Sequence, residues 1–385
     1  MEPRHVSGKD HWYHETQSRT QHSDVMPLVP EAAHVDDRFL LDLALPDALF
    51  NASQRWLSAA RLLAETLFPN VVTTNRLRTF SAYDRLSTAL TVAQVSGVQR
   101  LCNHYAARLA PLPGPDSSRE SNHRLAQITQ YARQLASSPS IITPRARQQL
   151  DAVGLTQHDV ILINQVVGFV GFQARVIALF QAYMGFPVRW IPGMPVQEDA
   201  DPGLFHDDCA PWHTDLASIE VHQANTPQGE ALARWRHVPE LAALAPVLAQ
   251  EEIVLNRLGE LTDALSFAHP LLPLSSLIPA RINGSASCFH YYSSQWQGAS
   301  GLPEAIRNGE RAIQAWCHYY PCEQAVAQAT QLLTRAPDRF SAAQLNPLFE
   351  QGLSIPDAIT LLAWSALTGW MNRLRIALGC EQQLT

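Results

Sequence analysis

The sequence predicts an all-α protein made of two tandem helical domains with an N-terminal extension. The first observation is an internal repeat, because residues 135–180 match residues 333–378 at a constant displacement of 198 positions. The second is that each copy ends in a long stretch that is apolar on most of its circumference, Val160 to Phe180 and Ala358 to Leu378. The third is that each stretch follows a glycine and a helix-capping pattern. Together they predict a duplicated helical core.

Identical residues keep the two copies in register: Leu135 and Leu333, Pro139 and Pro337, Gly154 and Gly352, Asp159 and Asp357, Arg175 and Arg373. Both glycines suit the left-handed residue that lies just beyond a helix end. Two residues later, Thr156-x-x-Asp159 and Ser354-x-x-Asp357 have the spacing of a capping box. We therefore expect a long helix to begin at the same point of each copy.

The two long apolar stretches are interpreted as buried central helices. Membrane spans are the rival interpretation. Polar side chains interrupt both stretches, which disfavours that rival and predicts no membrane partner. They are Asn164, Gln165, Gln173 and Arg175 in the first copy, and Asn372, Arg373 and Arg375 in the second.

The sequence divides into four parts. Residues 1–30 are polar and rich in histidine and are expected to form a flexible arm; residues 31–183 form the first domain, a proline-rich linker covers 184–212, and residues 213–385 form the second domain. Asp47 to Phe68 has the spacing of an amphipathic helix that we expect to lie across the first repeat. Tyr83 to Leu109 reads as one helical segment, and Thr226 to Phe267 as further helices.

Composition narrows the class of protein. With 385 residues the chain is long enough for two ordinary domains. The net charge is −7 and there is no basic run, so the sequence does not indicate binding to nucleic acid. Six scattered cysteines favour a reducing compartment, and the N-terminus has no apolar signal segment, so we expect a cytoplasmic protein.

A second, shorter repeat, called the echo below, lies upstream of each repeated stretch. The first copy contains Cys102-Asn-His104-Tyr105 and the second contains Cys288-Phe-His290-Tyr291, at a displacement of 186. The second copy has therefore gained 12 residues between this motif and the central stretch. We expect the insertion around Trp296 to Cys322.

Asn283-Gly284-Ser285-x-x-Cys288, with the repeated segments that end at Arg175 and Arg373, resembles the carboxymuconolactone decarboxylase and alkylhydroperoxidase-D-like superfamily. The resemblance is to its peroxidase-related branch with two fused copies, and it covers roughly residues 75–183 and 226–380. It implies two tandem alkylhydroperoxidase-D-like helical domains and a homo-oligomer.

Peroxidases of that superfamily use a Glu about three turns before a Cys-x-x-Cys-x-x-x-His. One thiolate attacks the peroxide, the second resolves the sulfenic acid, and the His and Glu handle protons. This chain departs from the motif: the Glu, first Cys, second Cys and His positions hold Pro273, Ser285, Cys288 and Tyr292 in the second copy, and Leu86, Val98, Leu101 and Tyr105 in the first. A two-thiol cycle is unavailable in either motif.

The resemblance favours a peroxidase-related oxidoreductase that uses a single cysteine, with a peroxide as substrate and a thiol as reductant. The candidate catalytic residues are Cys288, Ser285, His290 and Tyr292 in the second copy, and Cys102 and His104 in the first. An inert buried thiol and a satisfied core histidine remain alternatives at each position. The sequence has no phosphate loop, nucleophile elbow or dinucleotide fingerprint, so no cofactor is predicted.

Two other functions stay open. A cofactor-free decarboxylase acting on a small acid would use His104 or His290 as general acid and Arg281 as carboxylate anchor. A non-catalytic helical scaffold or ligand-binding protein would keep both repeats without the chemistry. Cys317 and Cys322 could supply a resolving thiol from the insertion.

A polar segment in the linker is the last candidate. It contains His206-Asp-Asp-Cys209 with His213 and Asp215, which are zinc-ligand types. Their spacing matches no rigid metal site, so a solvated loop is favoured and no metal is predicted.

Overall fold

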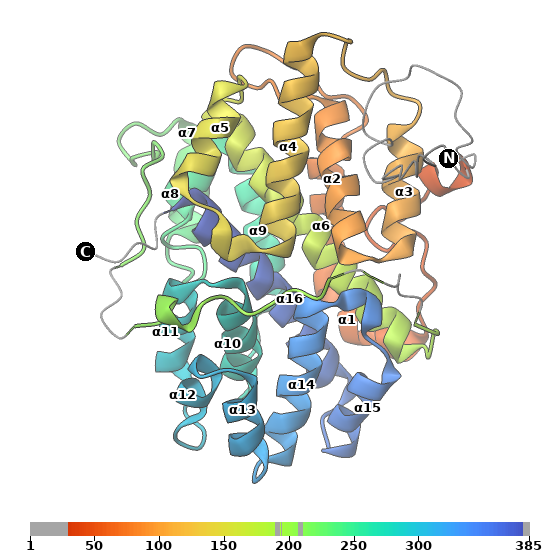
Figure 1. Cartoon of the computed structure of the whole chain (residues 1–385), viewed down its shortest axis with the longest axis vertical. Coiled ribbons are helices and arrows are strands. Elements are labelled where there is room, and N and C mark those ends of the chain that lie inside the picture. Colours follow the sequence, from red (N-terminus) through yellow and green to blue (C-terminus); the bar gives the residue numbers. More distant parts are fainter. Residues whose placement is uncertain (1–29, 189–192, 194, 207–210, 380–385) are drawn as a thin grey trace, which may run out of the picture.

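The computed structural model describes residues 30–188, 193, 195–206 and 211–379, which fold into helices with no β-strand among them (Figure 1). The all-α prediction is confirmed. The arm expected at residues 1–30 lies outside the described part except for Pro30. The α-helices are α1 (Asp47–Leu67), α2 (Ala82–Ser96), α3 (Gln99–Leu109), α4 (Arg119–Ser137), α5 (Pro144–Ala152), α6 (Gln157–Tyr183), α7 (Thr226–Trp235), α8 (Ala245–Leu248), α9 (Glu252–Leu265), α10 (Leu272–Asn283), α11 (Ala286–Gln295), α12 (Leu302–Arg307), α13 (Glu310–Cys317), α14 (Pro321–Arg335), α15 (Ala342–Glu350) and α16 (Ile355–Leu378).

The long helices α6 and α16 begin where the sequence predicts. Gly154 and Gly352 have φ values of +83° and +90°, the left-handed conformation expected after a helix end. At α6 the capping box is complete, because the Thr156 hydroxyl accepts from the Asp159 N–H while the Asp159 carboxylate accepts from the Thr156 N–H. At α16 the Ser354 hydroxyl accepts from the Asp357 N–H and donates to the carboxylate of the same residue.

Two series of elements follow the same order. The first is α2, α3, α4, a 3₁₀ turn at Pro139–Ile141, α5 and α6; the second is α10, α11, α14, a 3₁₀ turn at Pro337–Arg339, α15 and α16. The segment expected as one helix at Tyr83 to Leu109 is two helices, which corrects the prediction. Gly97 adopts φ +68° and ends α2, as Gly284 with φ +88° ends α10.

The insertion falls where the sequence predicts it. Helices α12 and α13 lie between α11 and α14, whereas the first series has only the loop from Ala110 to Ser118 between α3 and α4. They occupy the lower end of the molecule, with α12 beside α10 and α13 beside α14 (Figure 1). The second series therefore carries an additional helical layer.

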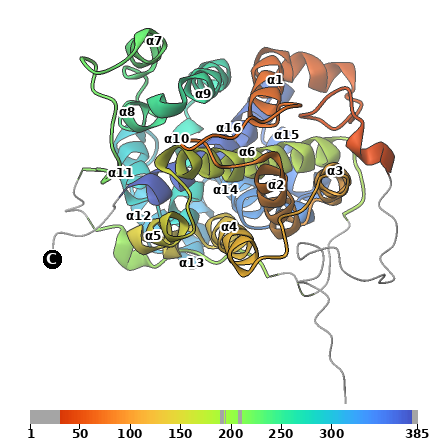
Figure 2. The same cartoon turned by 90° about the horizontal axis from the view of Figure 1, so that it is seen from above.

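Helices α6 and α16 pack against each other through the middle of the molecule (Figure 2). They pack tightly at Gly168, where a Cβ atom would lie 1.8 Å from Cδ1 of Trp370. The Trp370 ring therefore fills the space that the missing side chain leaves. Phe169 and Phe172 flank the same indole, with ring centroids 6.1 and 6.4 Å away. The two series consequently share one continuous hydrophobic core.

Helix α1 forms as the amphipathic pattern predicts, but it does not lie mainly on the first series. It packs most extensively against α9 and then against α16 (Figure 2). Its Trp56 also reaches α6, where it contacts the rings of Phe172 and Phe180. On α9 the side chains of Leu258 and Leu261 are fully buried.

The 3₁₀ turn of each series packs against the glycine of the other. A Cβ atom on Gly97 would lie 2.9 Å from Cβ of Asp338, and one on Gly284 would lie 2.7 Å from Cβ of Ser140. Ser140 and Asp338 are themselves 198 positions apart, like the repeat. The contacts between the series are therefore reciprocal.

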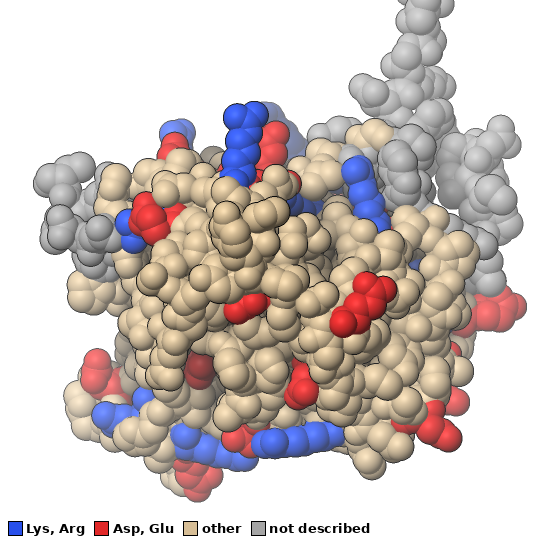
Figure 3. All heavy atoms as spheres, turned by 90° about the horizontal axis from the view of Figure 1, so that it is seen from below, with Lys and Arg blue, Asp and Glu red and all other residues tan. Residues whose placement is uncertain are grey.

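Of the described helices, α6 alone is long and apolar enough to cross a membrane, and its apolar window is entirely buried inside the molecule. That burial is typical of a core helix in a globular protein. On the face at the lower end of the molecule, arginine side chains are scattered among acidic ones and form no basic patch (Figure 3).

Candidate functional site

Cys288, the first candidate catalytic residue, lies in the first half of α11 and is only 5% exposed. Ser285 is the N-cap residue of that helix and is completely buried, and Tyr292 is 6% exposed. Burial raises the pKa of Tyr292 well above its usual value, with Glu240 and Cys288 as nearby contributors.

His290 does not join Cys288 on one helix face, because residues two apart on a helix point about 200° away from each other. His290 is partly exposed, and its Nε2 is buried without a hydrogen-bond partner in the described chain. The structure thus brings Cys288 and Tyr292 together, one helical turn apart, and directs His290 elsewhere.

In the first series the left-handed glycines set a different register from the Cys-x-His-Tyr echo. Gly284 lies 187 residues after Gly97, so Leu101 corresponds to Cys288 and Cys102 comes one residue late. Cys102 is partly exposed on α3, whereas Cys288 is buried on α11. The echo at a displacement of 186 therefore does not place the two thiols in equivalent positions.

His104 is buried and held by the backbone. Its Nδ1 lies 2.7 Å from the carbonyl oxygen of Ala32. Burial lowers the pKa of His104 to about 4, and Arg108 and Arg38 lower it further, against the opposing effect of the Ala32 hydrogen bond. The imidazole is therefore neutral at pH 7 and structurally satisfied.

The two candidate sets lie far apart. Helices α3 and α11 are on opposite sides of the molecule in both cartoon views (Figures 1 and 2). Cys102 and His104 consequently cannot complete a site at Cys288 within one chain. A second thiol from the insertion is also unsupported by the chemistry, because burial raises the pKa of Cys317 to about 11 and also raises that of Cys322. No disulfide joins Cys102, Cys288, Cys317 or Cys322.

Arg281 is engaged in the fold. Its Nε donates to the carbonyl oxygen of Arg307 and one terminal nitrogen donates to that of Ala200. The guanidinium also lies over the Phe205 ring, 5.0 Å from its centroid. These contacts occupy the group that a decarboxylase was expected to use as a carboxylate anchor.

The polar linker segment falls partly outside the described residues, because 207–210 are not described. In the part of the chain that is described, no group of three or more His, Cys, Asp or Glu side chains is placed to hold a metal ion. The proposal of a solvated loop therefore remains a prediction.

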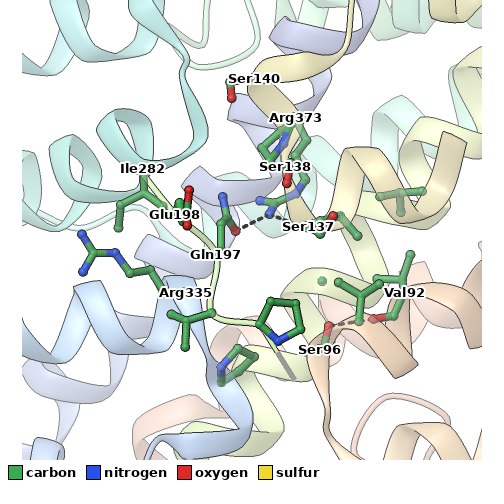
Figure 4. Close-up of a pocket in the computed structure, with 18 of the residues that line it drawn as sticks. Val92, Ser96, Ser137, Ser138, Ser140, Gln197, Glu198, Ile282, Arg335 and Arg373 are labelled. Carbon is green, nitrogen blue, oxygen red and sulfur yellow. Dashed lines mark hydrogen bonds between the residues drawn. The ribbon is translucent and has the colours of Figure 1, made fainter. Parts of the chain in front are cut away.

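A cavity of about 330 Å³ lies between the two series of helices. Its walls come from α2, the end of α4 with the following 3₁₀ turn, α6, α14 and α16 (Figure 4). Linker residues 195–199 run along it. Three arginines line the cavity, Arg175, Arg335 and Arg373, together with hydroxyl groups and valine side chains.

The linker is fastened across this cavity by side chains of the second series. The Gln197 amide donates to Oδ1 of Asn283, 2.9 Å away, and its Oε1 accepts from Arg373, 3.4 Å away (Figure 4). The Asp199 carboxylate accepts from Arg335 at 2.6 Å. The linker therefore forms one wall of the cavity.

Arg175 and Arg373 connect the two series across the same cavity. Arg373 on α16 donates from Nε to the carbonyl of Leu135 and from a terminal nitrogen to that of Ala136, both in the last turn of α4. Arg175 on α6 donates to the carbonyl of Thr334 in the last turn of α14. Guanidinium groups at helix C-termini are favoured by the helix dipole. The sequence identifies both arginines as equivalent residues of the repeat. Only the tertiary structure shows that they line the same cavity.

Comparison with protein-family models gives no match to this chain, and comparison with curated proteins gives none either.

Proposed function

We propose that this chain is a non-catalytic ligand-binding protein built from two tandem alkylhydroperoxidase-D-like helical units, and that its ligand occupies the cavity between them. The observation that carries the proposal is the burial of Cys288, 5% exposed, on a helix with no second thiol at the family position. A peroxidase needs its thiolate to meet the peroxide. The thiol chemistry is therefore lost while the helical framework is kept.

The matching order of elements supports the duplication in this proposal. So do the reciprocal contacts of the 3₁₀ turns with Gly97 and Gly284, and the reciprocal reach of Arg175 and Arg373. Such exchanged contacts are expected when two copies of one unit pack about an approximate twofold axis. Self-association and a cytoplasmic location remain part of the proposal on the sequence alone.

The cavity supports the binding role. Its volume lies at the lower end of the range for small-molecule sites, and it combines apolar walls from Val92, Val95 and Val167 with a few polar groups. Sites of that composition bind small solutes by enclosing them and orient them by hydrogen bonds. The decarboxylase alternative gains no support, because Arg281 and His104 are both engaged by backbone carbonyls.

The remaining competitor is a one-cysteine peroxidase at Cys288. The test is consumption of hydrogen peroxide and tert-butyl hydroperoxide in the presence of dithiothreitol, comparing wild type with Cys288→Ser. We expect no catalytic turnover above the reaction of dithiothreitol alone and no difference between the two proteins. Turnover that disappears in Cys288→Ser would overturn the proposal.

Thiol alkylation provides a matched control within the same molecule. Cys102 is partly exposed and Cys288 is buried. We expect iodoacetamide to modify Cys102 at least ten times faster than Cys288 in the folded protein, and both at similar rates in 8 M urea. A Cys288 that reacts faster in the folded protein than in urea would indicate an activated thiolate and contradict the loss of thiol chemistry.

A further inference from the structure

Arg175 and Arg373 hold equivalent positions in the repeat, yet they use their hydrogen-bond donors unequally. Arg373 donates to the carbonyl oxygens of Leu135, Ala136 and Gly369 and to Gln197. Arg175 donates only to the carbonyl oxygens of Gly171 and Thr334 in the described chain. Its Nε is buried without a partner. A guanidinium has five N–H donors, so Arg175 retains three without a described acceptor.

Neither guanidinium has a carboxylate partner. Arg175 is 7% exposed and Arg373 is 4% exposed, and no ion pair with Asp or Glu involves either one in the described chain. Burial lowers the pKa of Arg175 to about 10, and burial together with Arg175 lowers that of Arg373 well below its usual value. Two buried cations that face one cavity repel each other, and their charge is offset only by helix carbonyls.

The carboxylates nearest the cavity are committed elsewhere or exposed. Asp199 pairs with Arg335, which also pairs with Glu310. Glu198 lies at the cavity wall with its side chain exposed. The Nε of Arg335 is also without a partner, but its charge is balanced by those two carboxylates. The uncompensated positive charge of the cavity therefore belongs to Arg175 and Arg373.

The linker satisfies only one of the two arginines. The Gln197 side chain places its amide oxygen 3.4 Å from Arg373. No described side chain supplies an acceptor to Arg175, and the cavity lies against that residue. An oxygen of a bound molecule would therefore have the same role at Arg175 that the amide oxygen of Gln197 has at Arg373.

We propose that the cavity binds a small molecule bearing a carboxylate, which Arg175 anchors through the remaining N–H groups of its two terminal nitrogens while Val92, Val95 and Val167 enclose the apolar part. Carboxylates match a guanidinium with two parallel hydrogen bonds. The cavity volume corresponds to on the order of ten water molecules, which limits the ligand to a compact acid. This assignment rests on the proposed ligand-binding function.

The first test compares acids with their neutral amides, which have nearly the same shape. Thermal unfolding and calorimetric titration of the full chain are measured with benzoate, benzamide, butyrate and butyramide. We expect at least one acid to bind and to raise the unfolding temperature, with its amide at least tenfold weaker. Equal binding of acid and amide would overturn the carboxylate assignment and leave the ligand-binding function standing. Binding of none of the four would overturn both.

Variants identify the anchor. Arg175→Gln is expected to weaken binding of the acid at least tenfold. Arg335→Gln is the comparison variant, because the charge of this cavity-lining arginine is already paired with Asp199 and Glu310, so a smaller loss of binding than in Arg175→Gln is expected. A larger loss in Arg335→Gln than in Arg175→Gln would overturn the assignment.

A second variant keeps the test valid if Arg175→Gln fails to fold. Val95→Phe fills the cavity wall from α2, where the side chain is only partly buried, and leaves every arginine in place. We expect it to keep the helical circular dichroism of wild type and to lose acid binding. Unchanged binding in a folded Val95→Phe protein would exclude the cavity as the site.

Discussion

The surroundings of Arg175 and Arg373 differ although the two residues occupy the same position in a repeated helix. Arg373 has four acceptors, because α4 and the linker bring three to it and its own helix supplies the carbonyl oxygen of Gly369. Arg175 has two acceptors and faces the cavity. The linker exists once in the chain, between the two series, so it can cover only one of two equivalent positions. The two arginine positions therefore differ because the linker reaches only one of them.

The buried polar side chains of the two series also differ. In the first, Tyr131 donates to Asn164 at 2.9 Å and Tyr105 donates to Gln173 at 2.6 Å. The repeat positions of Asn164 and Gln173 hold Leu362 and Met371 in the second. The two series thus share their backbone pattern but not their buried hydrogen bonds.

Of the substitutions considered, replacing Arg373 should lower the free energy of unfolding most. We expect Arg373→Ala to lower the free energy of unfolding by about 3–5 kcal/mol, because it leaves buried carbonyls of α4 without donors and each hydrogen bond to a charged group contributes about 1.5–3 kcal/mol. Arg175→Ala, with fewer bonds, should cost about 2–3 kcal/mol. Urea denaturation of both variants measures the order. Equal losses would contradict the unequal hydrogen bonding of the two arginines.

Acidification should affect the first series through His104. The folded pKa of about 4 lies below the usual value of 6.5, so the stability that the neutral ring contributes is complete above pH 6.5 and is lost as the pH falls toward 4. The loss should reach about 3 kcal/mol. His104→Gln should remove this dependence in urea denaturation between pH 7 and 4. A wild-type profile that is flat over that range would contradict the burial of a neutral imidazole.

Where α6 and α16 cross, we expect overpacking from a substitution in α6 but not from one at the equivalent position of α16. Gly168→Ala places a Cβ atom 1.8 Å from the Trp370 ring, so we expect a cost of about 1–3 kcal/mol from overpacking. The loss should shrink when Trp370→Phe is added, which a double-mutant cycle measures. Ala366 holds the position of Gly168 in α16, and Ala366→Gly should cost about 1 kcal/mol from helix propensity alone. If the effects of the two mutations were simply additive, the added methyl group would not meet the Trp370 ring.

The smallest expected effect concerns the linker. Gln197→Ala removes the amide that bridges Asn283 and Arg373, and we expect a loss of about 1–2 kcal/mol in the free energy of unfolding. Glu198→Ala is the control, because an exposed side chain at the same linker should change stability by less than about 0.5 kcal/mol. Equal effects of the two variants would mean that Gln197 is not a structural bridge.

The local elements were accessible from the sequence. Periodicity, capping residues and glycines predicted the all-α class, the starts of α6 and α16, the amphipathic α1 and the position of the insertion. Tyr83 to Leu109 was predicted as one helix, since the left-handed turn at Gly97 lies between two stretches with continuous helical spacing. The register of Cys102 was ambiguous in the sequence because two alignments, anchored on the cysteine or on Gly97, competed.

By itself the sequence determined which segments become helices, since capping and apolar spacing act within a few residues of the chain. Only the tertiary structure decided that Cys288 is buried, that α3 and α11 lie on opposite sides, and that Arg175 and Arg373 meet at one cavity. Those properties depend on how helices hundreds of residues apart pack together. Burial and hydrogen-bond partners belong to that packing, so no local pattern around either arginine could reveal which one the linker would leave unpaired.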